Sequence, residues 1–237
     1  MRHARGTPVH LAALLMLLTV PGGQGVAQPL SGFAVRKAEQ LLRDKHSCLG
    51  CHRLKGEGGQ LAPALDDVRG RRDAAYIAAI VSDPQRLKPG VSMPRVRMPA
   101  SERALIVRYL GGDPTRIEVP PGALSPVAPS PTAPDGKGLY AQWCAGCHGT
   151  TGMGDGPNAQ ALPVPPARHH DADAMRWRSD DALFDTIEAG GAIMNRHHRM
   201  PAFGGTLTTP QIRALVAYIR TLCRCQGPAW SRDGGPP

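Results

Sequence analysis

The sequence predicts an all-α protein built from two similar domains joined by a proline-rich linker. Three observations carry this prediction. Apolar residues recur three or four positions apart in several segments, and the same order of motifs occurs twice along the 237 residues. A third is the segment 111–134, which is rich in proline and lacks any periodicity, as in an extended linker. No segment has the alternation expected of a strand.

Each half of the repeat contains a capped amphipathic helix. In the first half it is "RDAAYIAAIVSD", for which Asp73 is the predicted N-cap, and in the second it is "SDDALFDTIEAG", for which Ser179 is the predicted N-cap. A Met-Pro pair follows each of these helices, and then a last helix, "ERALIVRYL" or "QIRALVAYI", in which Tyr109 and Tyr218 hold the same place. The two halves are therefore predicted to share one fold.

The N-terminus has the pattern of a secretory signal peptide. Two arginines precede the apolar run Leu11–Val20, which is too short to span a bilayer, and small residues at 25–27 form a cleavage site. We therefore expect a periplasmic or otherwise exported protein without a transmembrane segment in its mature chain. The predicted divisions are a signal peptide (1–27), domain 1 (28–112), the linker (113–133), domain 2 (134–226) and a flexible tail (227–237).

Composition limits what the two domains can be. Aromatic residues make up only 4% of the chain, so two separate cores would be thin unless a buried cofactor filled them. The net charge of +9 is unevenly distributed, since residues 29–112 carry 15 basic against 8 acidic side chains and residues 134–226 carry 9 against 8. Such a basic field favours association with an acidic surface. Nucleic-acid binding is not expected, because the sequence lacks interleaved basic and aromatic residues.

Four of the six cysteines form two copies of the pattern C-x-x-C-H. The copies are "CLGCH", Cys48–His52, and "CAGCH", Cys144–His148, and this pattern is typical of covalent c-type haem attachment. Two thiols at this spacing can reach both vinyl groups on one haem edge, and the adjacent histidine then lies against the iron. A zinc site, a thioredoxin-like redox motif and a local disulfide are alternatives. They fit less well with two copies that are each followed by histidine and by a Met-Pro pair.

With these motifs each half resembles a class I cytochrome c domain, and the whole resembles a tandem dihaem cytochrome c. The matching stretches include "GLYAQWCAGCHG" and "MPAFGGTLTTPQIRALVAYI" in the second half, and "CLGCH" and "GGQLAPALDDV" in the first. The resemblance implies two covalently bound haem c groups and single-electron transfer. It makes Cys48, Cys51, Cys144 and Cys147 the attachment sites and His52 and His148 the proximal iron ligands. Pro63 and one of Pro165 or Pro166 would supply the carbonyl that accepts the second N–H of each histidine.

The resemblance also implies a methionine opposite each histidine. In the second half Met200 is the candidate, with Met194, His197 and His198 as rivals. In the first half Met93 and Met98 both precede a proline, which restricts each to extended geometry.

The internal repeat separates these two methionines. When the last helices are aligned on their tyrosines, Met98 falls opposite Leu207 and Met93 falls near Met200. We therefore predict that Met93 binds iron and that Met98 packs at the start of the helix.

The function predicted is that of an exported dihaem cytochrome that passes electrons between redox partners, either alone or as the cytochrome subunit of a dehydrogenase or respiratory complex. It would perform no bond chemistry, and domain 1 would dock on an acidic partner surface. The alternative is a dihaem peroxidase, which needs one open iron site. The remaining cysteines, Cys223 and Cys225, fit neither haem motif, and a disulfide is the favoured interpretation.

Overall fold

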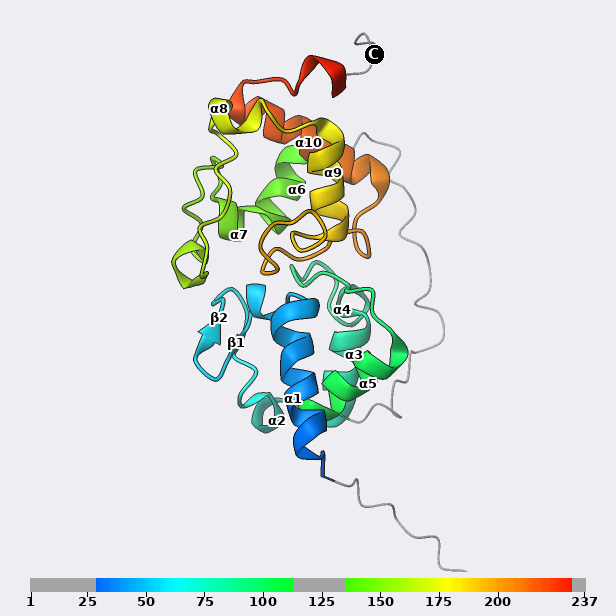
Figure 1. Ribbon diagram of the computed structural model, residues 1–237. Coiled ribbons are helices and arrows are strands. Elements are labelled where there is room, and N and C mark those ends of the chain that lie inside the picture. Colours follow the sequence, from blue (N-terminus) through cyan, green and yellow to red (C-terminus); the bar gives the residue numbers. More distant parts are fainter. Residues whose placement is uncertain (1–28, 113–134, 232–237) are drawn as a thin grey trace, which may run out of the picture.

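The computed structural model describes residues 29–112 and 135–231, which form two helical lobes, one above the other in Figure 1. We refer to residues 29–112 as domain 1 and to residues 135–231 as domain 2. The predicted signal peptide, the predicted linker and the last six residues lie outside the described residues. Within the described residues, no helix is long and apolar enough to cross a membrane.

Domain 1 is a small helical domain with one very short hairpin. Its helices are α1 (Gly32–Gln40), α2 (Val68–Arg71), α3 (Ala74–Ser82), α4 (Pro84–Leu87) and α5 (Ala100–Tyr109), and its strands are β1 (Arg53–Leu54) and β2 (Glu57–Gly58). The turn Leu41–Lys45 continues α1 as a single wider π-type turn. Helix α5 packs against α1 and α3, and the core between them contains Leu41, Leu42, Leu49, Leu54, Ile77, Ile106 and Leu110.

The hairpin corrects the expectation that the chain has no strand. Arg53 pairs with Gly58 and Leu54 with Glu57, so the connecting turn has only two residues, Lys55 and Gly56. Both of these have positive φ, 51° and 83°, as a tight two-residue hairpin turn requires. Strands of two residues are too short to produce an alternating sequence pattern, which is why the sequence did not indicate them.

Domain 2 is built mainly around its last helix. Its helices are α6 (Gly136–Trp143), α7 (Ala145–His148), α8 (Ala172–Met175), α9 (Asp180–Ala189) and α10 (Thr209–Cys223). Helix α10 packs against α6 and α9. The buried side chains between them include Tyr140, Met175, Leu183, Ile187, Phe203, Ile212, Leu215 and Ile219. Together with domain 1 this arrangement confirms the predicted all-α fold.

Both predicted helix caps are present. The Asp73 carboxylate accepts a hydrogen bond from the Tyr76 amide at the start of α3, and the Ser179 hydroxyl accepts one from the Ala182 amide at the start of α9. These side chains satisfy amides that have no partner within the helix. The two capped helices therefore begin where the sequence predicts.

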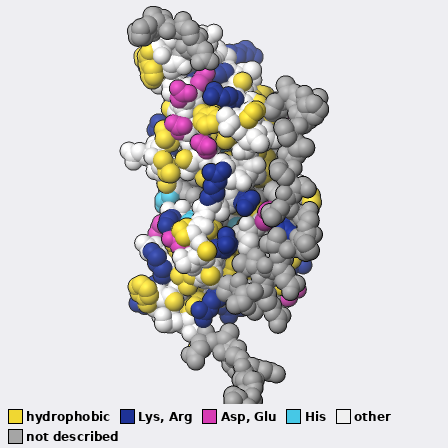
Figure 2. Space-filling model, turned by 90° about the vertical axis from the view of Figure 1, so that its right-hand side faces the viewer, with side chains coloured by type: hydrophobic (Ala, Val, Ile, Leu, Met, Phe, Trp, Pro, Cys, Tyr) yellow, Lys and Arg dark blue, Asp and Glu magenta, His cyan; other side chains and the backbone are white. Residues whose placement is uncertain are grey.

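The two domains differ in the charge of their surfaces. Figure 2 shows a group of acidic side chains on the upper lobe, domain 2, and Lys and Arg side chains on both lobes and at the boundary between them. The exposed face of α9 contributes to the acidic group, because its sequence DDALFDTIEA contains four carboxylates. The acidic group on domain 2 offsets the basic side chains there, whereas domain 1 keeps an excess of basic side chains.

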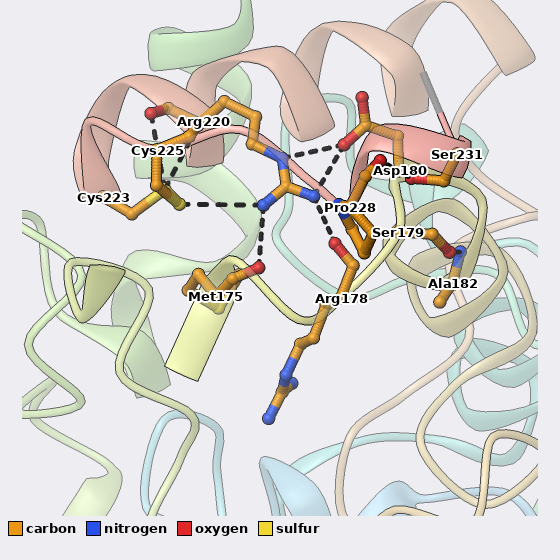
Figure 3. Close-up of polar contacts among 10 residues, drawn as sticks. All are labelled: Met175, Arg178, Ser179, Asp180, Ala182, Arg220, Cys223, Cys225, Pro228 and Ser231. Carbon is orange, nitrogen blue, oxygen red and sulfur yellow. Dashed lines mark hydrogen bonds and ion pairs between the residues drawn. A yellow bond between two sulfur atoms is a disulfide. The ribbon is translucent and has the colours of Figure 1, made fainter. Parts of the chain in front are cut away.

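The C-terminal end of domain 2 is held by Arg220 of α10. Its guanidinium donates to the Asp180 carboxylate at 2.7 Å, to the Met175 carbonyl at 2.9 Å and to the Arg178 carbonyl at 2.5 Å. Figure 3 shows these contacts beside a disulfide between Cys223 and Cys225. The chain then continues into a single turn at Ala229–Ser231, within the segment predicted to be a flexible tail.

Candidate haem-binding site

The two C-x-x-C-H motifs fold into similar turns. In domain 1 the amide of His52 donates to the Cys48 carbonyl at 3.0 Å, and in domain 2 the amide of His148 donates to the Cys144 carbonyl at 2.9 Å. In each case one helical turn brings the first cysteine and the histidine onto neighbouring positions. The spacing of the motif thus becomes a compact constellation of two thiols and an imidazole.

The four cysteines of these motifs are half-buried and form no disulfide with one another. Burial raises the pKa of Cys48, Cys51 and Cys144 to about 12. These three thiols are therefore neutral near pH 7. Among the described residues, no group of three or more His, Cys, Asp or Glu side chains is placed to hold a metal ion by itself.

Each motif histidine has its Nδ1 bound to a backbone carbonyl. The partner of His52 is the Pro63 carbonyl and the partner of His148 is the Ala167 carbonyl, both at 2.8 Å. The Pro63 contact is as predicted. The second differs from the expectation of Pro165 or Pro166, because the longer loop in this half brings the carbonyl that follows Pro166 to the ring.

These bonds fix the protonation of the imidazoles. A carbonyl only accepts, so each Nδ1 carries the proton and each Nε2 keeps a lone pair. Burial also lowers the pKa of both His52 and His148, which favours the neutral ring. A neutral imidazole with a free Nε2 and an oriented ring is the form that binds a metal.

One continuous cavity of about 1180 Å³ lies between and within the two domains, and both motifs line it. Its walls are largely apolar, and they include Leu42, Ile77, Val81, Val164, Leu183 and Phe203. Arg178 and Arg199 add positive charge, and the Nε and Nη1 atoms of Arg199 are buried without a hydrogen-bond partner among the described residues. The thiols, the free Nε2 atoms, the apolar walls and these guanidinium groups fit a haem with its acidic propionates.

The predicted methionines also line this cavity. Met93 lies in an extended loop where its carbonyl accepts from the Gln85 side chain at 3.0 Å, and Met200 lies in a loop where its carbonyl accepts from the Gly191 amide at 3.1 Å. Of the rivals to Met200, His197 lines the cavity, whereas Met194 and His198 are not part of its lining.

Met98 has a different environment from Met93, although it too reaches the cavity. It packs against the hydrophobic core of domain 1, directly before the N-cap residue Pro99 of α5. Leu207 holds the equivalent place before Thr208 of α10 and is buried. The match between these two positions agrees with the predicted packing role of Met98.

Two residues at the site were not indicated by the sequence. The ring of His169 is stacked on that of His148 with 4.1 Å between centroids, and its Nδ1 is 2.9 Å from the Tyr140 hydroxyl. Asn158 is completely buried beside Cys147. Both residues lie in irregular loops whose path has no periodic signal, so only their neighbours in space reveal their roles.

Comparison with known families agrees with this geometry. The cytochrome c family matches residues 35–112, and the family described as cytochrome c oxidase, cbb3-type, subunit III, matches residues 131–219. No curated protein and no solved structure matches the chain. The fold and the site define a c-type haem protein. The chain belongs to the cytochrome c class, with two tandem domains, two covalently bound haem c groups and a role in electron transfer.

Proposed function

We propose that each domain holds its haem iron between a histidine and a methionine. His52 and Met93 are the axial ligands in domain 1, and His148 and Met200 are those in domain 2. Cys48 and Cys51 form the thioethers to the first haem, and Cys144 and Cys147 form those to the second. The observation that carries this proposal is the pair of carbonyl-bound histidines, His52 and His148, in one cavity with both methionines.

The chain prepares these groups in three ways. The Pro63 and Ala167 carbonyls orient the imidazoles and keep the proton on Nδ1. Pro94 and Pro201 keep the preceding methionines in extended backbone, away from helical geometry. The apolar walls limit access of water. A haem with a His/Met ligand pair supplies a one-electron couple of raised reduction potential.

The protein acts as an exported dihaem electron carrier that connects two redox partners. The signal-peptide pattern at 1–27 supports export to the periplasm, and the domain boundaries at 28–112 and 134–226 remain predictions. In this role it acts either as a free electron carrier or as the cytochrome subunit of a dehydrogenase or respiratory complex. The excess of basic side chains in domain 1 supports docking of that domain on an acidic partner surface.

The absorption spectrum of the oxidised holoprotein tests the proposal. We expect two low-spin ferric haems, each with the weak long-wavelength band of methionine-to-iron coordination. A high-spin haem that reacts with peroxide would contradict the proposal and favour the dihaem peroxidase instead. Addition of an external ligand such as cyanide provides a control. A methionine-bound iron must first release its sulfur and binds cyanide slowly, whereas an iron with an open site binds it at once.

A further inference from the structure

Each haem-attachment turn contacts the other domain across the domain boundary. A Cβ atom at Gly50, within the first motif, would lie 2.2 Å from the Arg199 carbonyl oxygen of domain 2. A Cβ atom at Gly146, within the second motif, would lie 2.7 Å from Cδ1 of Leu61 in domain 1. Each turn therefore lies directly against the other domain, and the central glycine of each motif leaves the space for it.

Asn158 lies at the centre of this contact. It precedes the short turn Ala159–Ala161 of domain 2, and its side chain is completely buried. Its Nδ2 donates to the Gly50 carbonyl of domain 1 at 2.7 Å, and its Oδ1 accepts from the Gln60 amide of domain 1 at 2.7 Å. One amide group thus makes two short hydrogen bonds to the opposite domain.

Asn158 is also bound to the motif of its own domain. Its backbone amide donates to the Gly146 carbonyl at 3.0 Å, and Nδ2 lies 3.4 Å from Sγ of Cys147, in hydrogen-bonding contact with the sulfur. The residue therefore joins the first attachment turn at Gly50 to the second at Gly146 and Cys147. Its two amide protons and its carbonyl all have partners, as a fully buried asparagine requires.

The surroundings leave no freedom for this amide. A Cβ atom at Gly59 would lie 2.8 Å from Oδ1 of Asn158 and 2.4 Å from the Gly50 carbonyl oxygen. A second bond across the boundary, from the Ser47 hydroxyl to the His198 carbonyl at 2.6 Å, holds the residue just before Cys48. The two attachment turns are consequently fixed relative to each other by buried, directional contacts.

We propose that Asn158 is a positioning residue that holds the two haem-attachment turns together and thereby sets the rate of electron transfer from one haem to the other. This inference rests on the proposed electron-carrier function. The transfer oxidises one iron and reduces the other by a single electron, and no bond is made or broken. Its rate falls steeply with the distance between the haem edges, and the attached cysteines determine where those edges lie.

Asn158→Ala and Asn158→Asp test the inference in the full-length holoprotein. The aspartate keeps the shape and the acceptor for Gln60 but places a carboxylate oxygen against the Gly50 carbonyl, so it separates hydrogen bonding from volume. It also serves as the second variant should the alanine variant fail to fold. Gln60→Ala is the matched control, because it removes an exposed side chain and keeps the backbone amide that binds Asn158.

Two measurements read the outcome. Pulsed electron paramagnetic resonance gives the distribution of inter-iron distances, and NMR exchange spectroscopy on the half-reduced protein gives the intramolecular electron-exchange rate. We expect both Asn158 variants to broaden the distance distribution. We also expect a lower exchange rate in both Asn158 variants, because a looser contact between the turns lengthens the path between the haem edges, while Gln60→Ala behaves as the wild type.

Wild-type distances or wild-type rates in both Asn158 variants would overturn the inference. The ferric spectrum of each variant is recorded alongside. If the wild-type spectrum lacks methionine coordination, the proposed function fails. The inter-iron distances then still report whether Asn158 fixes the two turns.

Discussion

Domain 1 and domain 2 form the same haem-binding turn, but they stabilise it with different kinds of polar contact. In domain 1 partly buried carboxylates make the contacts: Glu102 binds Lys45 and the buried His46, and Glu39 binds Lys55 and the Tyr109 hydroxyl. In domain 2 the contact beside the motif histidine is neutral and buried, between Tyr140 and His169. The same motif is thus accompanied by carboxylate pairs in domain 1 and by a buried neutral pair in domain 2.

The largest expected effect concerns the methionine ligand proposed in each domain. Met93→Ala and Met200→Ala should each remove roughly half of the methionine-to-iron absorption of the ferric protein, because one of two equivalent ligands is lost. Each variant should also lower the reduction potential of one haem only. Spectrophotometric redox titration measures both quantities.

Met98→Ala is the matched control for Met93→Ala. It should leave the absorption band intact and lower the free energy of unfolding by about 2 kcal/mol, because Met98 packs against the core of domain 1. If Met98→Ala removed the band and Met93→Ala did not, the alignment of the two halves on Tyr109 and Tyr218 would be wrong.

The next effect tests the contrast between buried and exposed polar pairs. Tyr140→Phe leaves the buried His169 ring without its hydroxyl partner and should cost about 2 kcal/mol of unfolding free energy. Tyr109→Phe removes a hydroxyl whose partner Glu39 also binds Lys55, and it should cost less than about 1 kcal/mol. Equal costs, measured by denaturant unfolding, would contradict the contrast.

The basic surface of domain 1 can be tested by charge reversal. Lys88 and Arg97 are exposed on either side of Met93, and the double variant Lys88→Glu/Arg97→Glu should slow reduction by an acidic redox protein by roughly tenfold at low ionic strength. Stopped-flow kinetics across a salt series measures the rate. Lys137→Glu, an exposed change in domain 2, should have little effect, and an equal loss there would argue against docking at domain 1.

The smallest effect concerns the last helix of each domain. Thr208 caps α10 in a reciprocal arrangement with Gln211, whereas α5 begins after Pro99 and has no side-chain cap. Thr208→Ala should therefore cost about 1 kcal/mol. Gln211→Ala removes only one half of the arrangement, so a cost greater than that of Thr208→Ala in thermal unfolding would show that the cap is not the source of the effect.

The features that the sequence predicted correctly depend on short stretches of chain. The caps Asp73 and Ser179, the C-x-x-C-H turns and the contact of His52 with the Pro63 carbonyl each involve residues within about a dozen positions of one another. Local backbone geometry and hydrogen bonding suffice for these. The repeat and its haem motifs likewise determined the family, the all-α fold and the cofactor.

The two wrong predictions concern features that depend on loop geometry. The two-residue strands β1 and β2 were missed, and the carbonyl that binds His148 belongs to Ala167 rather than to Pro165 or Pro166. A hairpin of four paired residues leaves no periodic pattern, and one residue more or less in a loop changes which carbonyl reaches the ring. Propensity carries little information about either.

Sequence alone determined that this protein carries two haem-binding domains and which cysteines and histidines form their motifs. The tertiary structure brings both motifs to one cavity, stacks His169 on His148, and joins Asn158 to Gly50 more than a hundred positions away. The physical reason is that periodicity and capping act between neighbours in the chain. Contacts between distant loops form only when the surrounding elements pack, within domain 2 for His169 and His148 and between the two domains for Asn158 and Gly50.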